Sequence, residues 1–143
     1  MPTPHDRTFV ELTPAELYGI LRLRAEVFVV EQAAAYLDPD GRDTEPTARQ
    51  LWFEGEAGTV VATARVLDDG DARRIGRIAT RTDHRGRGLA AQLVNHFLAS
   101  AVGPWRLDAQ AHLSGWYERF GFAVDGPEYD DDGIPHVPMV RRA

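Results

Sequence analysis

Apolar positions along the chain follow two different spacings, and the change between them marks the expected elements. A helical spacing runs through residues 14–32 and returns from Leu89 onward, until Gly103 and Pro104 stop the second helix. Residues 13–16 read Thr-Pro-Ala-Glu, a capping box with proline at the first helical position. We therefore predict two amphipathic helices, and the spacing puts Arg24 and Glu31 on the apolar stripe of the first one.

Shorter apolar runs between turn residues predict a set of strands. These runs are residues 9–12, 50–54, 59–67, 74–80, 105–110, 122–124 and 136–140. A third, short helix is expected at residues 113–120, with Gly121 as its C-terminal cap. The order β-α-β-β-β-α-β-α-β-β predicts a mixed sheet with helices, in the α/β (α+β) class.

The composition is that of one ordinary folded domain, and it excludes several kinds of chemistry. The chain has 143 residues, of which 43% are hydrophobic and 27% charged, and it has no cysteine. A disulfide framework, a thiolate nucleophile and a cysteine-type zinc site are therefore excluded. Every basic residue is an arginine, which also excludes a lysine Schiff base.

Charge and hydropathy limit the expected partners. The net charge of −6 argues against a general nucleic-acid binder. No stretch approaches the roughly 20 apolar residues that a membrane span needs, and residues 1–7 lack the apolar run of a signal peptide. We therefore expect a cytoplasmic protein that binds neither nucleic acid nor a membrane.

A glycine-rich segment, Arg85-Gly86-Arg87-Gly88, lies between the strand that ends near Thr80 and the helix that begins near Leu89. A helix N-terminus offers unpaired N–H groups and partial positive charge, so phosphate is the expected occupant. Glycine lets the backbone approach the ligand closely, and the two arginines would add charge-assisted hydrogen bonds. The segment is the end of a stretch with six arginines, which are Arg73, Arg74, Arg77, Arg81, Arg85 and Arg87. This local basic cluster indicates an anionic ligand or, alternatively, a solvated charged surface.

Two cofactors compete for this segment. Gly86, Gly88 and Ala91 fit the dinucleotide fingerprint G-x-G-x-x-A, and Asp108 follows about 20 residues later. A dinucleotide fold, however, needs two mononucleotide-binding halves around a parallel sheet. Here hairpins precede the motif and a single crossover helix follows it, which disfavours a nicotinamide or flavin.

The segment also matches a family motif. Arg85-x-x-Gly88-x-Ala90 resembles the (Gln/Arg)-x-x-Gly-x-(Gly/Ala) motif of the GNAT acetyltransferase superfamily, and Tyr117 with residues 120–122 resembles its Tyr-x-x-(apolar)-Gly-Phe pattern. Within that superfamily the chain looks most like the ElaA family. The matching segments are residues 23–24, 27–32, 36, 38–43, 75–77, 109–113 and 128–136. Ala34-Ala35 replaces the family's common Cys-Pro, and Gln50 replaces its common histidine.

The resemblance implies a GNAT-like single domain over residues 1–143, with a mostly antiparallel mixed sheet. It implies an enzyme that moves an acetyl group from acetyl-CoA, without a metal, to a primary amine by direct attack. The cosubstrate would lie in a V between two strands, contacted on one side by backbone of Ile78, Ala79 and Thr80 and on the other by Gln110. One N–H there would polarise the thioester carbonyl. Its pyrophosphate would be held at Arg85, Gly86, Arg87, Gly88, Leu89 and Ala90.

The resemblance makes Tyr117 the candidate general acid that protonates the departing thiolate. Spacing alone places Tyr117 on an apolar stripe, so a core position is the alternative. His112 is the candidate general base, Glu31 acting through water is another, and His136 and His84 are weaker candidates.

Arg24, Glu31, Tyr36 and Asp38 are the candidate contacts to the acceptor amine, a small molecule or a peptide. The alternative for the charged members is an internal ion pair between helix and loop. The acidic loop, residues 38–43, does not fit a calcium loop, because its glycine falls early and Arg49 stands at the closing position. A carboxylate rim there would favour a cationic acceptor, and a solvated surface is the alternative. A binding module that holds acyl-CoA without chemistry is the second functional hypothesis, and the chain is expected to be a monomer or a homodimer.

Overall fold

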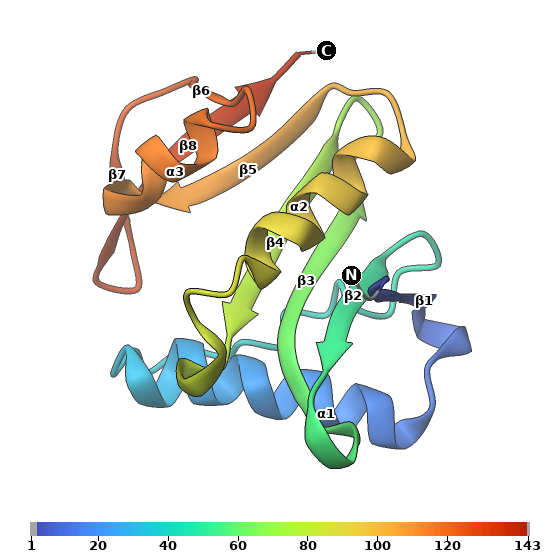
Figure 1. Cartoon of the computed structure of the whole chain (residues 1–143). Helices are drawn as coiled ribbons and strands as arrows, with labels where there is room; N and C mark the ends of the chain where they lie inside the picture. Colours follow the sequence, from blue (N-terminus) through green and yellow to red (C-terminus); the bar gives the residue numbers. More distant parts are fainter. Residues whose placement is uncertain (1–2, 143) are drawn as a thin grey trace.

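The strands form one mixed sheet with helices on both faces, in a computed structural model that describes residues 3–142 (Figure 1). The order is β1-β2-β3-β4-β5-β8-β6, and β7 pairs with β8. Every pairing is antiparallel except β4 with β5, which confirms the predicted fold class. The strands are β1 (His5–Thr8), β2 (Arg49–Glu54), β3 (Val60–Asp68), β4 (Arg73–Thr80), β5 (Trp105–Gln110), β6 (Ala123–Val124), β7 (Tyr129–Asp131) and β8 (Ile134–Arg141).

Three α-helices flank the sheet: α1 (Pro14–Arg24), α2 (Leu89–Ser100) and α3 (Ser114–Glu118). The predicted capping box is present, since the Thr13 hydroxyl accepts from the Glu16 N–H at 3.1 Å and the Glu16 carboxylate accepts from the Thr13 N–H at 2.9 Å. After α1 the helix continues as a π-helix, η2 (Ala25–Glu31), with Gln32 as its C-cap, close to the predicted end. Short 3-10 turns are η1 (Phe9–Glu11), η3 (Glu56–Gly58), η4 (Thr82–His84) and η5 (Ala111–Leu113). None of the helices within residues 3–142 has the length and apolar character to cross a membrane.

Two strand predictions need correction. The strand predicted at residues 9–12 is wrong, because that segment forms η1 and the strand lies just before it. A Glu11 carboxylate that accepts from the Thr8 N–H at 2.8 Å turns the chain at this point. Strand β7 was not predicted, because its three residues are exposed and polar. It forms through a tight turn at Asp132 and Gly133, whose φ values of 51° and 83° suit a two-residue hairpin.

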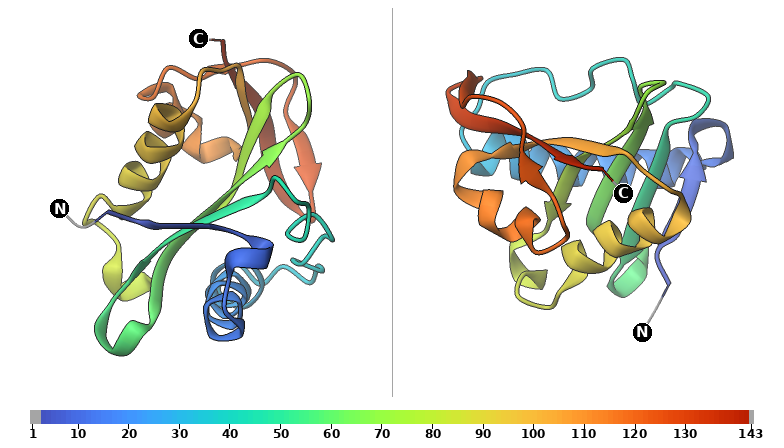
Figure 2. Two further views of the ribbon diagram at one scale, coloured as in Figure 1. Left: turned by 90° about the vertical axis from the view of Figure 1, so that its right-hand side faces the viewer. Right: turned by 90° about the horizontal axis from the view of Figure 1, so that it is seen from above.

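Apolar side chains pack on both faces of the sheet. Neighbouring residues of a strand point to opposite faces, so Leu51 packs with Phe97 of α2, whereas Trp52 packs with Ile20 and Leu23 of α1. The left-hand view of Figure 2 shows α1 and α2 on opposite sides of the sheet. The sheet therefore lies between two hydrophobic cores, one on each face.

Strands β4 and β5 separate along their length, which opens the sheet. They pair only at Arg73 with Trp105 and Arg74 with Arg106, and then diverge (Figure 1). Strand β4 also carries a β-bulge on the side that pairs with β3. Gly76 and Ala79 are successive paired residues there, so the two residues between them have no partner in the register with β3. Arg77 lies in this bulge with a φ of 52°. β-Bulges are frequent beside active sites, where they redirect backbone groups and side chains.

Candidate functional site

A cavity of about 240 Å³ lies where β4 and β5 diverge. Its wall combines the π-helix and the loop after it, strands β3, β4 and β5, the β7–β8 hairpin, and one residue of α3. The lining includes Phe28, Gln32, Tyr36, Arg65, Arg74, Arg77, Ile78, Asp108, Gln110, Tyr117, Tyr129, Asp131, Asp132, Ile134 and His136. Residues distant in sequence therefore meet at the point where the sheet is open.

Tyr117 lines this cavity from α3 and is almost fully buried, with 8% of its surface exposed. Its ring makes edge contacts with Trp116, at 4.9 Å between centroids, and with Phe122, at 6.4 Å. Its hydroxyl has no hydrogen-bond partner within residues 3–142. Burial raises the pKa of Tyr117 to about 12, so the phenol keeps its proton at neutral pH. The geometry leaves a neutral hydroxyl donor facing the cavity.

The three candidate histidines lie in different places. His84 of η4 has its Nδ1 2.8 Å from the Asp83 carboxylate and does not line the cavity. His112 is exposed in η5 and does not line the cavity, whereas His136 of β8 does. The Nδ1 of His136 is 2.8 Å from the carbonyl oxygen of Ile134. Because a carbonyl oxygen only accepts, Nδ1 carries the proton in this contact, and Nε2 is the acceptor of the neutral ring. The sequence signal for His136 was its place in the segment 128–136 that matches the ElaA family.

The predicted pantetheine contacts follow β4 past its bulge. Ile78 lines the cavity, whereas Ala79 is buried against β3. The Thr80 carbonyl accepts from Nε of Arg85 at 3.0 Å. On the opposite strand Gln110 lines the cavity at the end of β5. Beyond Arg74, β4 has no strand partner on its β5 side in the described part of the chain, so an extended ligand can occupy that side.

The glycine segment forms the start of α2. Gly86 and Gly88 have φ values of 77° and 74°, a conformation that glycine adopts without strain, and Gly88 is the N-cap. No side chain caps this helix and no acidic residue lies in its first turn. The N–H groups of the first turn thus have no intrahelical acceptor, and nothing on the helix itself repels an anion.

Most arginines of the 73–87 run are paired with carboxylates. Arg85 holds Glu31 with both terminal nitrogens, at 2.6 and 2.8 Å, and Arg81 holds Asp83 at 2.7 Å. Arg73 and Arg87 differ, since within residues 3–142 they donate only to backbone carbonyls, of Val102 at 2.8 Å and of Asp83 at 3.2 Å. The arginine run is therefore largely neutralised, and an anion at α2 would rely on backbone N–H groups and Arg87. A contact from Arg85 to the ligand would compete with Glu31.

Arg24 is fully buried, with 0% of its surface exposed, and does not line the cavity. It donates to Asp38 at 2.8 Å and to Asp43 at 2.7 Å. This is the internal ion pair between helix and loop, so Arg24 is unavailable to an acceptor. Of the four residues predicted to contact the acceptor, only Tyr36 lines the cavity, and its hydroxyl donates to Asp38 at 2.6 Å.

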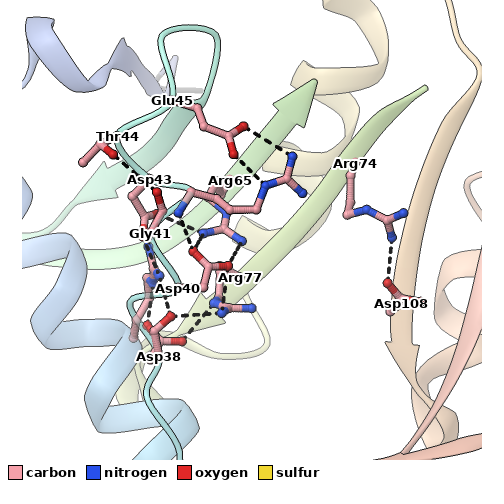
Figure 3. A network of polar contacts seen from close by, with 12 residues as sticks. Asp38, Asp40, Gly41, Asp43, Thr44, Glu45, Arg65, Arg74, Arg77 and Asp108 are labelled. Atoms are coloured by element: carbon pink, nitrogen blue, oxygen red, sulfur yellow. Dashed lines mark hydrogen bonds and ion pairs between the residues drawn. The ribbon is translucent and has the colours of Figure 1, made fainter. Parts of the chain in front are cut away.

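The acidic loop is likewise occupied by arginines. Figure 3 shows Asp38, Asp40 and Asp43 directed toward Arg65 and Arg77. Arg65 holds Asp40 at 2.9 Å and Asp43 at 3.1 Å, while Arg77 holds Asp38 at 2.9 Å. The loop is thus a structural clamp on β3 and β4, and the expectation of a free carboxylate rim at residues 38–43 is wrong.

Known proteins share this arrangement over nearly the whole chain. A family model described as an acetyltransferase (GNAT) domain matches residues 20–143. A UPF0039 protein of Mycobacterium tuberculosis is 47% identical over 137 residues, which cover 92% of this chain and 87% of that protein. Protein ElaA of Escherichia coli is 39% identical over 141 residues, covering 92% of this chain and 90% of ElaA.

Solved structures agree with the sequence matches. The crystal structure of Escherichia coli ElaA superposes with a TM-score of 0.91 at 35% identity, covering 99% of this chain and 100% of that one. An acyl-CoA N-acyltransferase from Pseudomonas aeruginosa superposes with a TM-score of 0.92 at 37% identity, covering 99% of both chains.

Proposed function

Since the chain belongs to the GNAT acetyltransferase family, whose fold serves acyl-CoA-dependent N-acyl transfer, we propose that it moves an acetyl group from acetyl-CoA to a primary amine. The observation that carries the proposal is the buried Tyr117 side chain, which lines the cavity between β4 and β5 and whose hydroxyl has no hydrogen-bond partner within residues 3–142. The proposal places the reaction in the cytoplasm.

The residues at the opening fit the cosubstrate. Its pantetheine would lie between Ile78, Ala79 and Thr80 on one side and Gln110 on the other. In this region β4 and β5 are not hydrogen-bonded to each other. Its pyrophosphate would be held by N–H groups of residues 86–90 and by Arg87, because that helix start carries no cap and no acid. Acetyl-CoA supplies an acyl group activated as a thioester.

The chain's own residues would position the reactants and move the protons. The amine nitrogen attacks the acyl carbon, the new C–N bond forms and the C–S bond breaks. Tyr117 holds a proton for the departing sulfur. We assign the general base to His136 in place of His112, because His136 lines the cavity and its Nε2 is free to accept the proton that the amine loses. A backbone N–H beyond the β4 bulge would polarise the acyl oxygen.

Binding and turnover test the proposal separately. CoA at about 100-fold its Kd should stabilise the protein by about 2.7 kcal/mol in a thermal-shift experiment, and NAD should not. Acetyl-CoA with a panel of primary amines should release free thiol. A shift with CoA but no thiol release with any amine would favour the binding module. A shift with NAD but not with CoA would overturn the reading of the glycine segment.

A further inference from the structure

Two carboxylates of the β7–β8 hairpin line the cavity without an ion-pair or hydrogen-bond partner in the described part of the chain. The three arginines that line the cavity are each held by aspartates: Arg65, Arg74 and Arg77. Asp108 is held in turn by Arg74 at 2.7 Å, as Figure 3 shows. Asp131 and Asp132 also line the cavity, and their carboxylates have no ion-pair or hydrogen-bond partner within residues 3–142. The cavity therefore presents uncompensated negative charge.

The strand register places this charge beside the proposed catalytic groups. His136 of β8 lies opposite Gln110 of β5 on one side and Tyr129 of β7 on the other. Asp131 is two residues beyond Tyr129 and so projects from the same face of the hairpin. At about 3.3 Å per residue, Asp131 lies roughly 7 Å along the sheet from the row that contains His136.

Tyr117 gives a second, independent indication that the cavity holds a polar ligand. More than nine-tenths of its surface is buried, yet its hydroxyl finds no partner in the described part of the chain. Because Tyr117 lines the cavity, its hydroxyl can donate to an acceptor atom that a ligand brings into the cavity.

We propose, on the basis of the proposed function, that the acceptor is a dication: a linear diamine or longer polyamine. One amine reaches His136 and Tyr117 in its neutral form. The other remains an ammonium and lies at Asp131 and Asp132. The acidic loop at residues 38–43 cannot serve this purpose, because arginines already neutralise its carboxylates.

Three acceptors of equal chain length test the proposal with acetyl-CoA and the full chain. They are 1,5-diaminopentane, pentylamine and 5-aminopentanoate. At the end opposite the reacting amine, the first carries a positive charge, the second no charge and the third a negative charge. We expect kcat/KM for the diamine to exceed that for pentylamine at least fivefold, with 5-aminopentanoate the poorest. The advantage should shrink as salt is raised, because the two carboxylates are exposed.

Matched variants locate the effect. The double variant Asp131→Asn/Asp132→Asn should raise KM for the diamine about fivefold or more and change KM for pentylamine less than twofold. The control variant is Glu128→Gln, because Glu128 is an exposed carboxylate near the same hairpin that does not line the cavity. It should leave KM unchanged for the diamine and for pentylamine. Equal kcat/KM for diamine and pentylamine, or a diamine advantage that survives the double variant, would overturn the proposal while leaving acetyl transfer intact.

Thermal shift by 1,5-diaminopentane, compared with pentylamine, separates the two proposals. If no amine releases thiol but the diamine stabilises the wild type and not the double variant, the dication site stands and acetyl transfer fails. If no amine is turned over and the diamine gives no such shift, both proposals fail.

Discussion

At the scale of single residues, Tyr117 combines two positions that the sequence presented as alternatives. Its ring packs against Trp116 and Phe122, as the apolar stripe indicates, while the residue also lines the cavity, as the family motif implies. Spacing along α3 can assign the ring to the core. It cannot show that the hydroxyl is left without a partner, because that depends on strands far away in the sequence.

Tyr117→Phe should lower kcat by about 10²-fold or more, because the departing sulfur loses its proton donor. The substitution removes no hydrogen bond, so urea unfolding should change by less than about 1 kcal/mol and CoA binding should persist. Steady-state thiol release and a CoA titration measure the two effects. Since burial raises the pKa of Tyr117 to about 12, kcat of the wild type should show no loss from its ionisation up to about pH 10. An unchanged kcat in Tyr117→Phe would refute its role as the acid.

The histidines show the limit of sequence reasoning for the proposed base. His112 was the first candidate for the general base, and His136 was ranked lower. Which histidine reaches the cavity depends on the pairing of β8 with β5, where His136 lies opposite Gln110. Such register over more than 20 residues of chain is set by packing, and no local pattern reveals it.

At the scale of elements, the bulge in β4 positions the proposed thioester contacts. The hairpins that join β2, β3 and β4 were predictable because their apolar runs and turn residues are local signals. The bulge was not, because Arg77 carries its positive φ although arginine does not favour that conformation. The conformation is held from outside β4, since Arg77 contacts the Asp38 carboxylate at 2.9 Å and the Asp38 carbonyl at 3.0 Å.

Two substitutions at Arg77 distinguish the effect of the bulge conformation from the effect of losing the ion pair with Asp38. Both Arg77→Gly and Arg77→Val lose the contacts to Asp38, but glycine accepts a φ of 52° and a β-branched residue does not. We expect Arg77→Val to be less stable than Arg77→Gly by about 1 kcal/mol in urea unfolding, with a several-fold higher KM for acetyl-CoA. Equal values for the two variants would mean that the bulge conformation does not control cosubstrate binding.

At the scale of the whole molecule, the buried network around Arg24 connects α1, the acidic loop, β2 and β3. Asp43 is its centre, since it accepts from Arg24, Arg65 and Gln50. Burial alone would raise the pKa of Asp43, but the Arg24 and Arg65 guanidinium groups outweigh it and hold the pKa below its usual value. The sequence did show both partners, an arginine on an apolar stripe and an acidic loop, but it left their pairing open.

This network should make the fold sensitive to acid. Because the folded pKa of Asp43 is depressed, its stabilisation is present above the unfolded pKa of about 3.9 and is lost as pH falls through the folded value. Asp43→Asn should cost about 3 kcal/mol at pH 7, since two buried guanidinium groups lose a charged partner. It should also flatten the fall in stability as the pH drops below about 4.

Urea unfolding at several pH values measures both effects. Asp125→Asn, which removes a partly exposed pair with Arg106, is the matched control and should change stability by less than about 1 kcal/mol. An Asp43→Asn variant with the stability and acid dependence of the wild type would show that the network does not hold the fold together.

The divergence of β4 and β5 has a further consequence for the entropy of binding. Each strand is fixed on its other side, β4 by β3 and β5 by β8, so the backbone groups that face the opening are already ordered before any ligand arrives. An extended amide chain that enters the opening therefore orders itself, while the protein loses little conformational freedom. The opening in the sheet is therefore a preorganised binding site, because the entropy cost of ordering its backbone was met when the chain folded.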